Sequence, residues 1–191
     1  MKIITAKKEN LKIILKGLKS GKVLIFPTDT VYGLICDAEN KKAVNKIFKI
    51  KERDKSKPLA VFVKNIVAAK KIVHINKKQE RFLKNNKLTV ILKAKKPYKL
   101  SPLVYKKGTI GIRMPDYEVL NSILEKFKKP IAQTSANISG RMATTKIKEV
   151  LEQFKNQKVG PDLTIDAGDL PKNKPSKVVD LTKKQLKILR K

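Results

Sequence analysis

Residues 22–34 read Lys-Val-Leu-Ile-Phe-Pro-Thr-Asp-Thr-Val-Tyr-Gly-Leu, an apolar strand followed at once by a hydroxyl-rich turn. Pro27 ends the expected strand, because proline has no N–H to give to a sheet. Thr28, Asp29 and Thr30 then place two hydroxyls and a carboxylate beyond the strand end, where open α/β sheets bind ligands. Taken alone, the segment would suit equally well an ordinary turn whose side chains bond to the nearby backbone.

On either side of this segment, apolar periodicity predicts helices and strands in alternation. The apolar residues between 11 and 18 recur at helical spacing, Gly21 ends that helix, and Asn40 can cap the next. Further helices are expected around residues 43–48, 65–72, 77–85, 120–127 and 147–154, and strands at 22–26, 59–63, 88–92, 109–113, 130–133, 163–166, 177–181 and 186–189. We therefore expect one α/β domain over residues 1–191, with a mixed sheet.

Composition excludes several kinds of site. The chain has 191 residues, 41% of them hydrophobic, and no apolar run of the length that spans a membrane. A single cysteine, Cys36, rules out an internal disulfide, and the N-terminus lacks a signal-type segment, so we expect a cytoplasmic protein. With one histidine, His74, a Cys/His zinc cluster or a conventional catalytic triad has too few members. No metal site built from protein side chains is expected.

The net charge of +30 permits two readings. A basic protein attracts polyanions such as RNA. However, 41 of the 46 basic residues are lysines spread along the whole chain, which is what an AT-rich genome produces by codon bias. The five arginines are more informative, because arginine is chosen where a planar, bidentate donor is needed. Arg53, Arg113 and Arg190 stand next to apolar segments, whereas Arg81 lies in a polar helix and is expected at the surface.

Lys51-Glu52-Arg53 follows the second expected helix. Basic residues at a helix C-terminus complement its dipole, which is one explanation. The other is that residues two apart on an extended segment point the same way, so Lys51 and Arg53 would grip one triphosphate. As exposed charges they would contribute little stability, and alanine at either position should leave the melting temperature nearly unchanged.

Small polar residues follow two further strands. Ser135, Asn137 and Ser139 alternate with apolar residues before Gly140, a pattern suited to phosphate or ribose oxygens and equally to a solvated turn. Ser176 stands before a late strand in the same manner, and Thr109 precedes Arg113 by four residues. Neither of the glycine-rich nucleotide signatures is present, so any ATP would be held by scattered strand-end residues.

Together these segments resemble the YrdC/TsaC family of L-threonylcarbamoyladenylate synthases, in its short, single-domain form without a C-terminal second domain. The resemblance covers roughly residues 5–190 and rests on the order and spacing of six motifs. They are Pro-Thr-Asp-Thr-Val-Tyr-Gly-Leu at 27–34, Lys-Glu-Arg at 51–53, Pro-Leu-Ala-Val-Phe-Val at 58–63, Gly-Thr-Ile-Gly-Ile-Arg-Met-Pro at 108–115, Thr-Ser-Ala-Asn-Ile-Ser-Gly at 134–140 and Pro-Ser-Lys-Val-Val-Asp-Leu at 175–181.

The resemblance implies a twisted mixed sheet flanked by helices, with a basic cavity, and a reaction that joins L-threonine, bicarbonate or CO2, and ATP into threonylcarbamoyl-AMP and pyrophosphate. Mg²⁺ would arrive with the ATP. A partner transferase would then modify position 37 of tRNAs that read codons beginning with A. By similarity, the ATP-binding residues would be Lys51, Arg53, Thr109, Ser135, Asn137 and Arg190, with Lys51 and Arg53 catalytic, and the threonine-binding residues would be Thr30, Arg113, Gln133 and Ser176.

The chain departs from the family pattern at Asp54 and Lys57, where relatives commonly carry other residues, and at Ala143, where Thr144 beside it is a substitute for the usual serine. The role of Arg141 and the source of selectivity for the threonine hydroxyl are open at this stage. Two alternatives also remain: a non-catalytic module that binds double-stranded RNA or tRNA, and a relative with the same fold and different carbamoyl or riboflavin-pathway chemistry.

Overall fold

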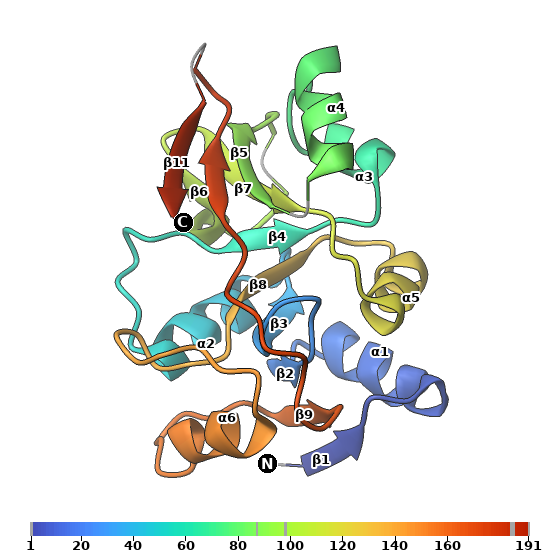
Figure 1. The fold of residues 1–191 in the computed structure, drawn as a ribbon, viewed down its shortest axis with the longest axis vertical. Coiled ribbons are helices and arrows are strands. Elements are labelled where there is room, and N and C mark those ends of the chain that lie inside the picture. Colours follow the sequence, from blue (N-terminus) through green and yellow to red (C-terminus); the bar gives the residue numbers. More distant parts are fainter. Residues whose placement is uncertain (1, 87, 98, 184–185, 191) are drawn as a thin grey trace.

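A computed structural model describes residues 2–86, 88–97, 99–183 and 186–190. One mixed sheet runs through the molecule in the order β1-β9-β2-β3-β8-β4-β7-β5-β10-β11, with β6 paired to β7 (Figure 1). The strands are β1 (Lys2–Thr5), β2 (Leu24–Phe26), β3 (Gly33–Asp37), β4 (Ala60–Phe62), β5 (Thr89–Lys93), β6 (Tyr105–Lys106), β7 (Thr109–Arg113), β8 (Ile131–Ser135), β9 (Leu163–Asp166), β10 (Val178–Asp180) and β11 (Lys187–Arg190). Parallel and antiparallel pairs alternate irregularly, which confirms the expected mixed sheet.

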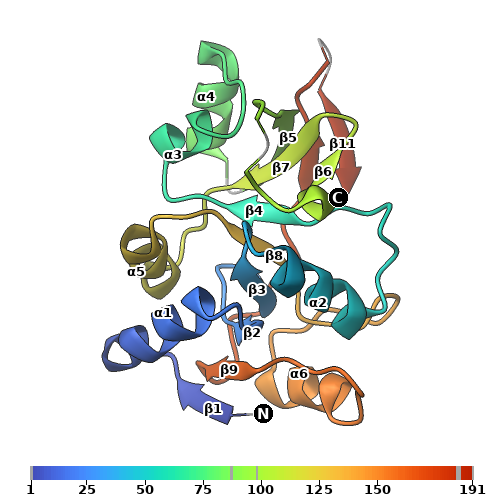
Figure 2. The ribbon, with the colours of Figure 1, turned by 180° about the vertical axis from the view of Figure 1, so that it is seen from behind.

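Helices pack on both faces of this sheet (Figures 1 and 2). The helices are α1 (Leu11–Lys19), α2 (Lys41–Lys51), α3 (Ile66–Lys70), α4 (Lys77–Asn85), α5 (Glu118–Phe127) and α6 (Ile147–Phe154), with short 3₁₀ turns at Lys8–Asn10 and Pro102–Val104. The apolar sides of α1 and α5 share one core cluster, and those of α2 and α6 share the other.

The two core clusters follow from the alternation of side chains along each strand. In β2, Leu24 and Phe26 face α1 and α5, whereas Ile25 between them joins the cluster beneath α2 and α6. β3 repeats the pattern, with Ile35 on the first face and Leu34 on the second. A strand that is apolar at every position is therefore buried on both sides, as the run before Pro27 predicts.

The residues expected to begin or end helices do so in the structure. The side chain of Asn40 accepts a 3.0 Å hydrogen bond from the backbone of Ala43 and so caps α2. Gly21 follows α1 with φ of +74°, a conformation that costs glycine nothing. The expected helices at 77–85 and 147–154 and the expected strands at 109–113 and 163–166 match the structure residue for residue, and the other predicted elements differ by a few residues at their ends.

Three strands were not predicted: β1, β3 and β6. The prediction was wrong most consequentially for Gly33 and Leu34, which begin β3 and are not part of the turn. Gly33 pairs with Ser135, and a Cβ there would lie 3.1 Å from the backbone oxygen of Thr134, so the glycine permits close approach to another strand and not to a ligand. β1 and β6 are short edge segments whose burial pattern is too weak to read from one sequence.

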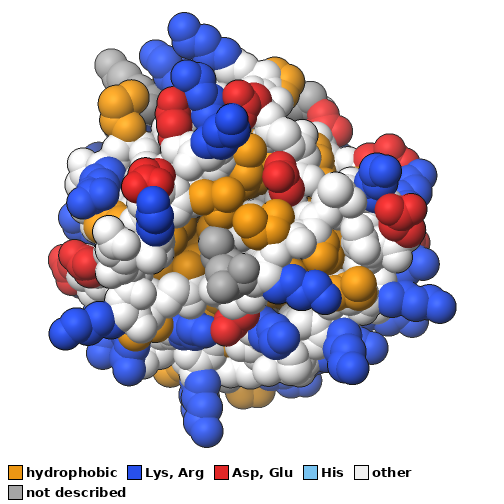
Figure 3. Space-filling view, turned by 90° about the horizontal axis from the view of Figure 1, so that it is seen from below, with side chains coloured by type: hydrophobic (Ala, Val, Ile, Leu, Met, Phe, Trp, Pro, Cys, Tyr) orange, Lys and Arg blue, Asp and Glu red, His pale blue; other side chains and the backbone are white. Residues whose placement is uncertain are grey.

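Lysine and arginine side chains are distributed around the molecule. Seen from below, basic side chains surround a face that also carries acidic residues and apolar side chains (Figure 3). This distribution agrees with the spread of lysines along the sequence. Within the described part of the chain, no helix combines the length and the hydropathy needed to cross a membrane.

Candidate active site

A cavity of about 450 Å³ opens on the sheet face that α1 and α5 cover elsewhere. Phe62 pairs with Ile131 beneath these helices, and both belong to their core cluster. Two residues away along the same strands, Ala60 pairs with Gln133, and this pair lines the cavity. Side chains two apart on a strand share a face, so the cavity lies where the helix layer stops and the sheet continues.

The cavity brings together most of the residues that the sequence singled out. Those that line it are Thr30, Arg53, Thr109, Arg113, Gln133, Ser135, Ser176 and Arg190. They come from segments far apart along the chain, and the expectation that Thr30, Arg53, Arg113 and Ser135 face one space is confirmed. Lys51 and Asn137 do not line the cavity but lie behind one of its walls.

One strand supplies four residues of the lining: Thr109, Ile110, Gly111 and Arg113 of β7. Thr109, Gly111 and Arg113 share one face of the strand, whereas the side chains of Ile110 and Ile112 belong to the core cluster on the other side. Thr109 donates to the backbone oxygen of Lys106 at 2.7 Å. Gly111 puts no side chain between Thr109 and Arg113.

Arg113 is almost fully buried and is held from one side. Its Nη2 donates to both carboxylate oxygens of Asp29 at 2.9 Å, and its Nη1 donates to the hydroxyl of Thr30 at 3.3 Å. Its Nε is buried and has no hydrogen-bond partner among the described residues, and the guanidinium lies 5.8 Å from the centre of the Phe62 ring. Burial lowers the pKa of Arg113, and the neighbouring Asp29 carboxylate opposes that effect.

Thr28 and Thr30 have different roles, since one bonds within the turn and the other faces the cavity. Thr28 bonds to its own turn, donating to the backbone oxygen of Val31 at 2.7 Å and accepting from the backbone N–H of Thr30 at 3.1 Å. The side chain of Thr30 meets Arg113 at the cavity wall. The segment is therefore both a self-bonded turn and a part of the site.

Three arginines line the cavity and contribute to its positive charge, together with Lys57 and Lys106. Arg53 is anchored by the backbone oxygens of Lys57 (2.8 Å) and Pro58 (3.3 Å), and Arg190 donates through Nε and Nη2 to the backbone oxygen of Ser176. Burial lowers the pKa of both, and mutual repulsion lowers it further, Arg53 by Arg190 and Arg190 by Arg113. Cations that repel one another across a cavity form a site for an anion.

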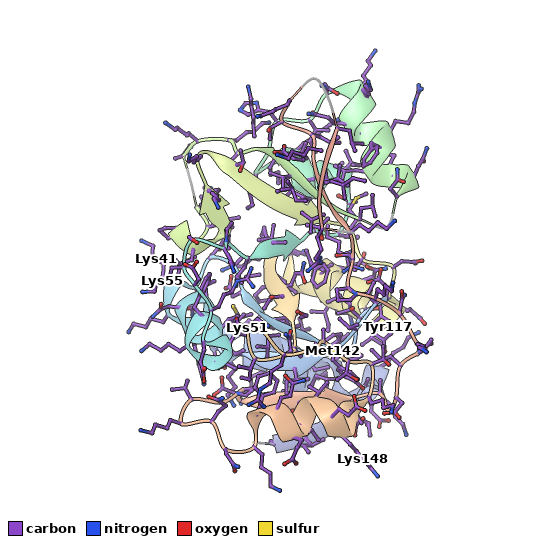
Figure 4. All side chains as sticks on the ribbon, turned by 60° about the vertical axis from the view of Figure 1, so that its left-hand side comes forward. Lys41, Lys51, Lys55, Tyr117, Met142 and Lys148 are labelled. Carbon is purple, nitrogen blue, oxygen red and sulfur yellow. The ribbon has the colours of Figure 1, made fainter. Side chains whose placement is uncertain are left out.

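The placement predicted for Lys51 was wrong. Lys51 is the last residue of α2 and only 1% exposed, and Glu52 after it takes the left-handed conformation (φ 51°), so Lys51 and Arg53 are not side by side on an extended segment. Figure 4 shows Lys51 inside the molecule at the end of α2, whereas Lys41 and Lys55 project from the surface.

The ammonium group of Lys51 is fully occupied by the protein. It donates to the backbone oxygens of Ser135 (2.6 Å) and Asn137 (2.5 Å) and to Oδ1 of Asn137 (3.0 Å), which uses all three of its protons. Burial, with a further contribution from Arg53, lowers the pKa of Lys51 to about 7. The group is thus a buried support for the 135–137 turn, and the expectation that alanine here would leave stability unchanged no longer holds.

Asn137 is the second half of this support. Its Oδ1 also accepts from the hydroxyl of Ser135 at 2.6 Å, and its Nδ2 donates to the backbone oxygens of Ile138 (2.9 Å) and Arg141 (2.6 Å). Arg141 contributes only this backbone oxygen, and its side chain is exposed. The turn therefore presents Ser135 to the cavity on a frame of bonds that does not depend on a ligand.

The positions that depart from the family pattern have separate surroundings. Lys57 lines the cavity, whereas Asp54 bonds to Ser56 in the preceding turn. The hydroxyl of Thr144 donates to Glu149 at 2.6 Å, away from the cavity lining. Arg81 is exposed, as predicted. The described residues contain no cluster of three or more His, Cys, Asp or Glu side chains that could hold a metal ion.

Sequence reasoning missed two groups of cavity residues. Thr89 and Ile91 of β5 line the floor, and Tyr32 anchors the segment after β9 by donating to the backbone oxygen of Gly168 at 2.6 Å. Gly111 offered a readable signal, because glycine inside a strand marks a close approach or a ligand. Thr89 offered none, since a threonine in a strand is ordinary.

Comparison with known proteins agrees with this geometry. Residues 16–191 match the Sua5/YciO/YrdC family model, whose description is "Telomere recombination". The threonylcarbamoyl-AMP synthase of Pyrococcus abyssi is 32% identical over 178 residues, which is 90% of this chain and 51% of that protein. The crystal structure of Pyrococcus abyssi Sua5 complexed with L-threonine superposes with a TM-score of 0.88 at 28% identity, over 99% of this chain and 56% of that one.

A second solved structure is close to this chain in length. Escherichia coli YciO superposes with a TM-score of 0.85 at 25% identity, over 100% of this chain and 94% of that one. This chain therefore spans about half the length of the Pyrococcus proteins and nearly all of YciO.

Proposed function

The chain belongs to the Sua5/YciO/YrdC family, and on that premise we propose that it is a nucleotidyltransferase that makes threonylcarbamoyl-AMP from L-threonine, bicarbonate or CO2, and ATP, with release of pyrophosphate. One observation carries the proposal: Arg53, Arg113 and Arg190 converge on a cavity that also holds the hydroxyls of Thr30 and Ser135. Such a cavity has the donors that both a triphosphate and a carboxylate require.

The two substrates divide the cavity. The triphosphate lies towards Arg53, Ser135, Thr109 and Arg190, with Lys51 and Asn137 holding the turn that carries Ser135. The amino acid lies towards Thr30, Arg113, Ser176 and the Gln133 end of β8. The guanidinium of Arg113 receives the carboxylate through Nη1, which has two protons and only a 3.3 Å bond to Thr30.

The reaction depends on positioning of the substrates and on stabilisation of phosphate charge more than on a general base. The threonine amine adds CO2 to give a carbamate, and one carbamate oxygen then bonds to the α-phosphorus while the bond to pyrophosphate breaks. Arg53 and Arg190 stabilise the negative charge that builds up on the phosphate oxygens. The buried frame of Lys51 and Asn137 keeps Ser135 in place, so no rearrangement is needed as the charge develops.

Mg²⁺ enters this proposal with the ATP. The cavity lining includes no aspartate or glutamate among the described residues, so the phosphate oxygens and water are its ligands, as is common for magnesium nucleotides. When bound, the ion neutralises phosphate charge. The product then passes to a threonylcarbamoyl transferase that modifies position 37 of tRNAs reading codons that begin with A. The cytoplasmic location and any direct tRNA contact stay predictions.

The test is pyrophosphate release from ATP and bicarbonate, measured with and without L-threonine. We expect release only with threonine, and we expect Arg53→Ala to lower kcat/KM by about 100-fold or more, as loss of a group that stabilises phosphate charge does. The exposed Arg81→Ala is the matched control and should retain full activity. Release that does not depend on threonine would refute the proposal, and tight binding of tRNA without any release would favour the non-catalytic alternative.

A further inference from the structure

Thr89 is a cavity residue to which the proposed reaction has so far given no role. It begins β5, is 3% exposed and lines the cavity floor. Its Oγ1 lies 3.0 Å from Oγ of Ser176, which is 7% exposed and lines the cavity as well. Two hydroxyls therefore meet at a place that is closed to bulk water and open to the ligand space.

One of the two protons of this hydroxyl pair is available for a hydrogen bond to a ligand. Each hydroxyl carries one proton, and the bond between Thr89 and Ser176 uses one of the two. Among the described residues, Ser176 Oγ has one other hydrogen-bond partner, Nη2 of Arg190 at 3.4 Å, and Arg190 is itself a donor. One proton and unused lone pairs remain for a ligand, which is how a site selects a hydroxyl over a methyl group.

The surface beside Thr89 is apolar and flat. A Cβ added at Gly111 would lie 3.3 Å from Cβ of Ala60 and 3.3 Å from the methyl group of Thr89, which is tighter than ordinary contact, so only glycine leaves this surface level. Ile91 pairs with Gly111 across the strands, and Val178 pairs with Thr89 from β10. The hydroxyl pair is thus bordered by an apolar surface made of Ala60, Gly111 and the methyl group of Thr89.

Thr89 also stands at the right place relative to the carboxylate site. Val90 pairs with Ile112 and Ile91 with Gly111, so Thr89 stands level with Arg113 on the adjacent strand. Residues opposite one another on antiparallel strands have Cβ atoms about 4.5–5.5 Å apart. An amino acid whose carboxylate meets Arg113 therefore brings its β-carbon, with the hydroxyl and methyl of threonine, next to Thr89.

We propose that Thr89, paired with Ser176, recognises the side-chain hydroxyl of the amino-acid substrate, while Gly111 and Ala60 form the apolar surface against which its methyl group packs. The inference rests on the proposed function, and it names Thr89 as a specificity-determining residue for a β-hydroxy amino acid. Valine has the shape of threonine but leaves the hydroxyl pair unsatisfied. Serine satisfies the pair but has no methyl group to pack on the apolar surface.

The experiment compares threonine, serine and valine in the pyrophosphate assay for the wild type, Thr89→Val and Thr89→Ser. Valine at position 89 keeps the shape and removes the hydroxyl, so the preference for threonine over valine should fall at least about tenfold, with the KM for ATP unchanged. Serine at position 89 keeps the hydroxyl and removes the methyl, so it should retain that preference. Thr164→Val, a buried threonine of β9 outside the cavity lining, is the matched control and should leave all preferences intact.

A full preference for threonine over valine in Thr89→Val would overturn the inference. Circular dichroism shows whether Thr89→Val is folded. If it is not, Thr89→Ser becomes the test, and a loss of its preference for threonine over valine would overturn the inference. Calorimetric titration of the wild type with threonine and valine separates this inference from the proposed function. A wild type that binds threonine well above valine but releases no pyrophosphate contradicts the reaction and supports the subsite, whereas equal binding of both amino acids contradicts the subsite alone.

Discussion

Lys51 lies where water hardly reaches, and burial lowers its pKa to about 7, while three protein acceptors stabilise its charged form. The three oxygens come from Ser135 and Asn137, and in return the backbone oxygen of Lys51 accepts from Ser139 at 2.8 Å. Lys51 therefore stabilises the turn that carries Ser135 and Asn137. Its effect on a bound phosphate is that of a nearby charge and not of a direct ligand.

Lys51→Ala should lower the free energy of unfolding by about 2–4 kcal/mol, because three buried acceptors lose their donor together. It should also remove pyrophosphate release, since Ser135 and Asn137 lose their frame. Urea denaturation measures the first effect. Lys41→Ala, at the exposed beginning of the same helix, is the control and should change stability by no more than about 0.5 kcal/mol. Equal stability of the two variants would mean that the Lys51 bonds contribute little to the fold.

The positions of the arginines show that residue type alone pointed to the site. In a chain that uses lysine almost everywhere, three of the five arginines line one cavity: Arg53, Arg113 and Arg190. The remaining two, Arg81 and Arg141, are exposed outside it. The choice of arginine over lysine was informative because a fork of N–H groups is needed only where geometry matters.

The connection between β9 and β10 is the element that closes the cavity. It runs up the front of the sheet in Figure 1 and brings Pro175 and Ser176 to the cavity wall. Its start is tied to the core by fully buried Tyr32, whose hydroxyl donates to Gly168 and accepts from the backbone N–H of Ala167 at 3.0 Å. Burial raises the pKa of Tyr32 to about 12, so the hydroxyl keeps its proton.

Tyr32→Phe should release this connection while leaving the core intact. Loss of the hydroxyl removes two hydrogen bonds and should cost about 1 kcal/mol of stability, because Ala167 and Gly168 are exposed and water can replace the partner. The KM for threonine should rise several-fold, since Ser176 is held less firmly. Tyr117→Phe, which alters a half-buried tyrosine outside the cavity lining, is the control. An unchanged KM in Tyr32→Phe would show that the connection is positioned without this anchor.

At the scale of the whole molecule, the net charge of +30 sets how the protein meets polyanions. The cations cover the surface without a dominant stripe on the face seen in Figure 3, and much of the site is made of buried groups. A field of this kind attracts nucleic acid through its phosphates and carries no sequence information.

Any RNA affinity should therefore fall steeply with salt. If six or more phosphates are contacted, binding should weaken by about 10³-fold between 50 and 200 mM salt, equally for unrelated RNA sequences. Fluorescence anisotropy with a labelled tRNA and a scrambled RNA of the same length measures both points. Affinity that survives at 200 mM salt, or that favours the tRNA, would show a specific RNA interface.

The sequence by itself determined the fold class and most of the elements, and of the ten site residues that the family resemblance implied, eight line the cavity. It did so because apolar spacing, caps and strand-end polar groups are local properties that survive without coordinates. Only the tertiary structure decided that Lys51 faces inward, that Gly33 begins a strand and that Thr89 stands beside Arg113. The burial of a charged side chain and the register of strands depend on which distant segments meet, and one chain read along its length has no local signal for either.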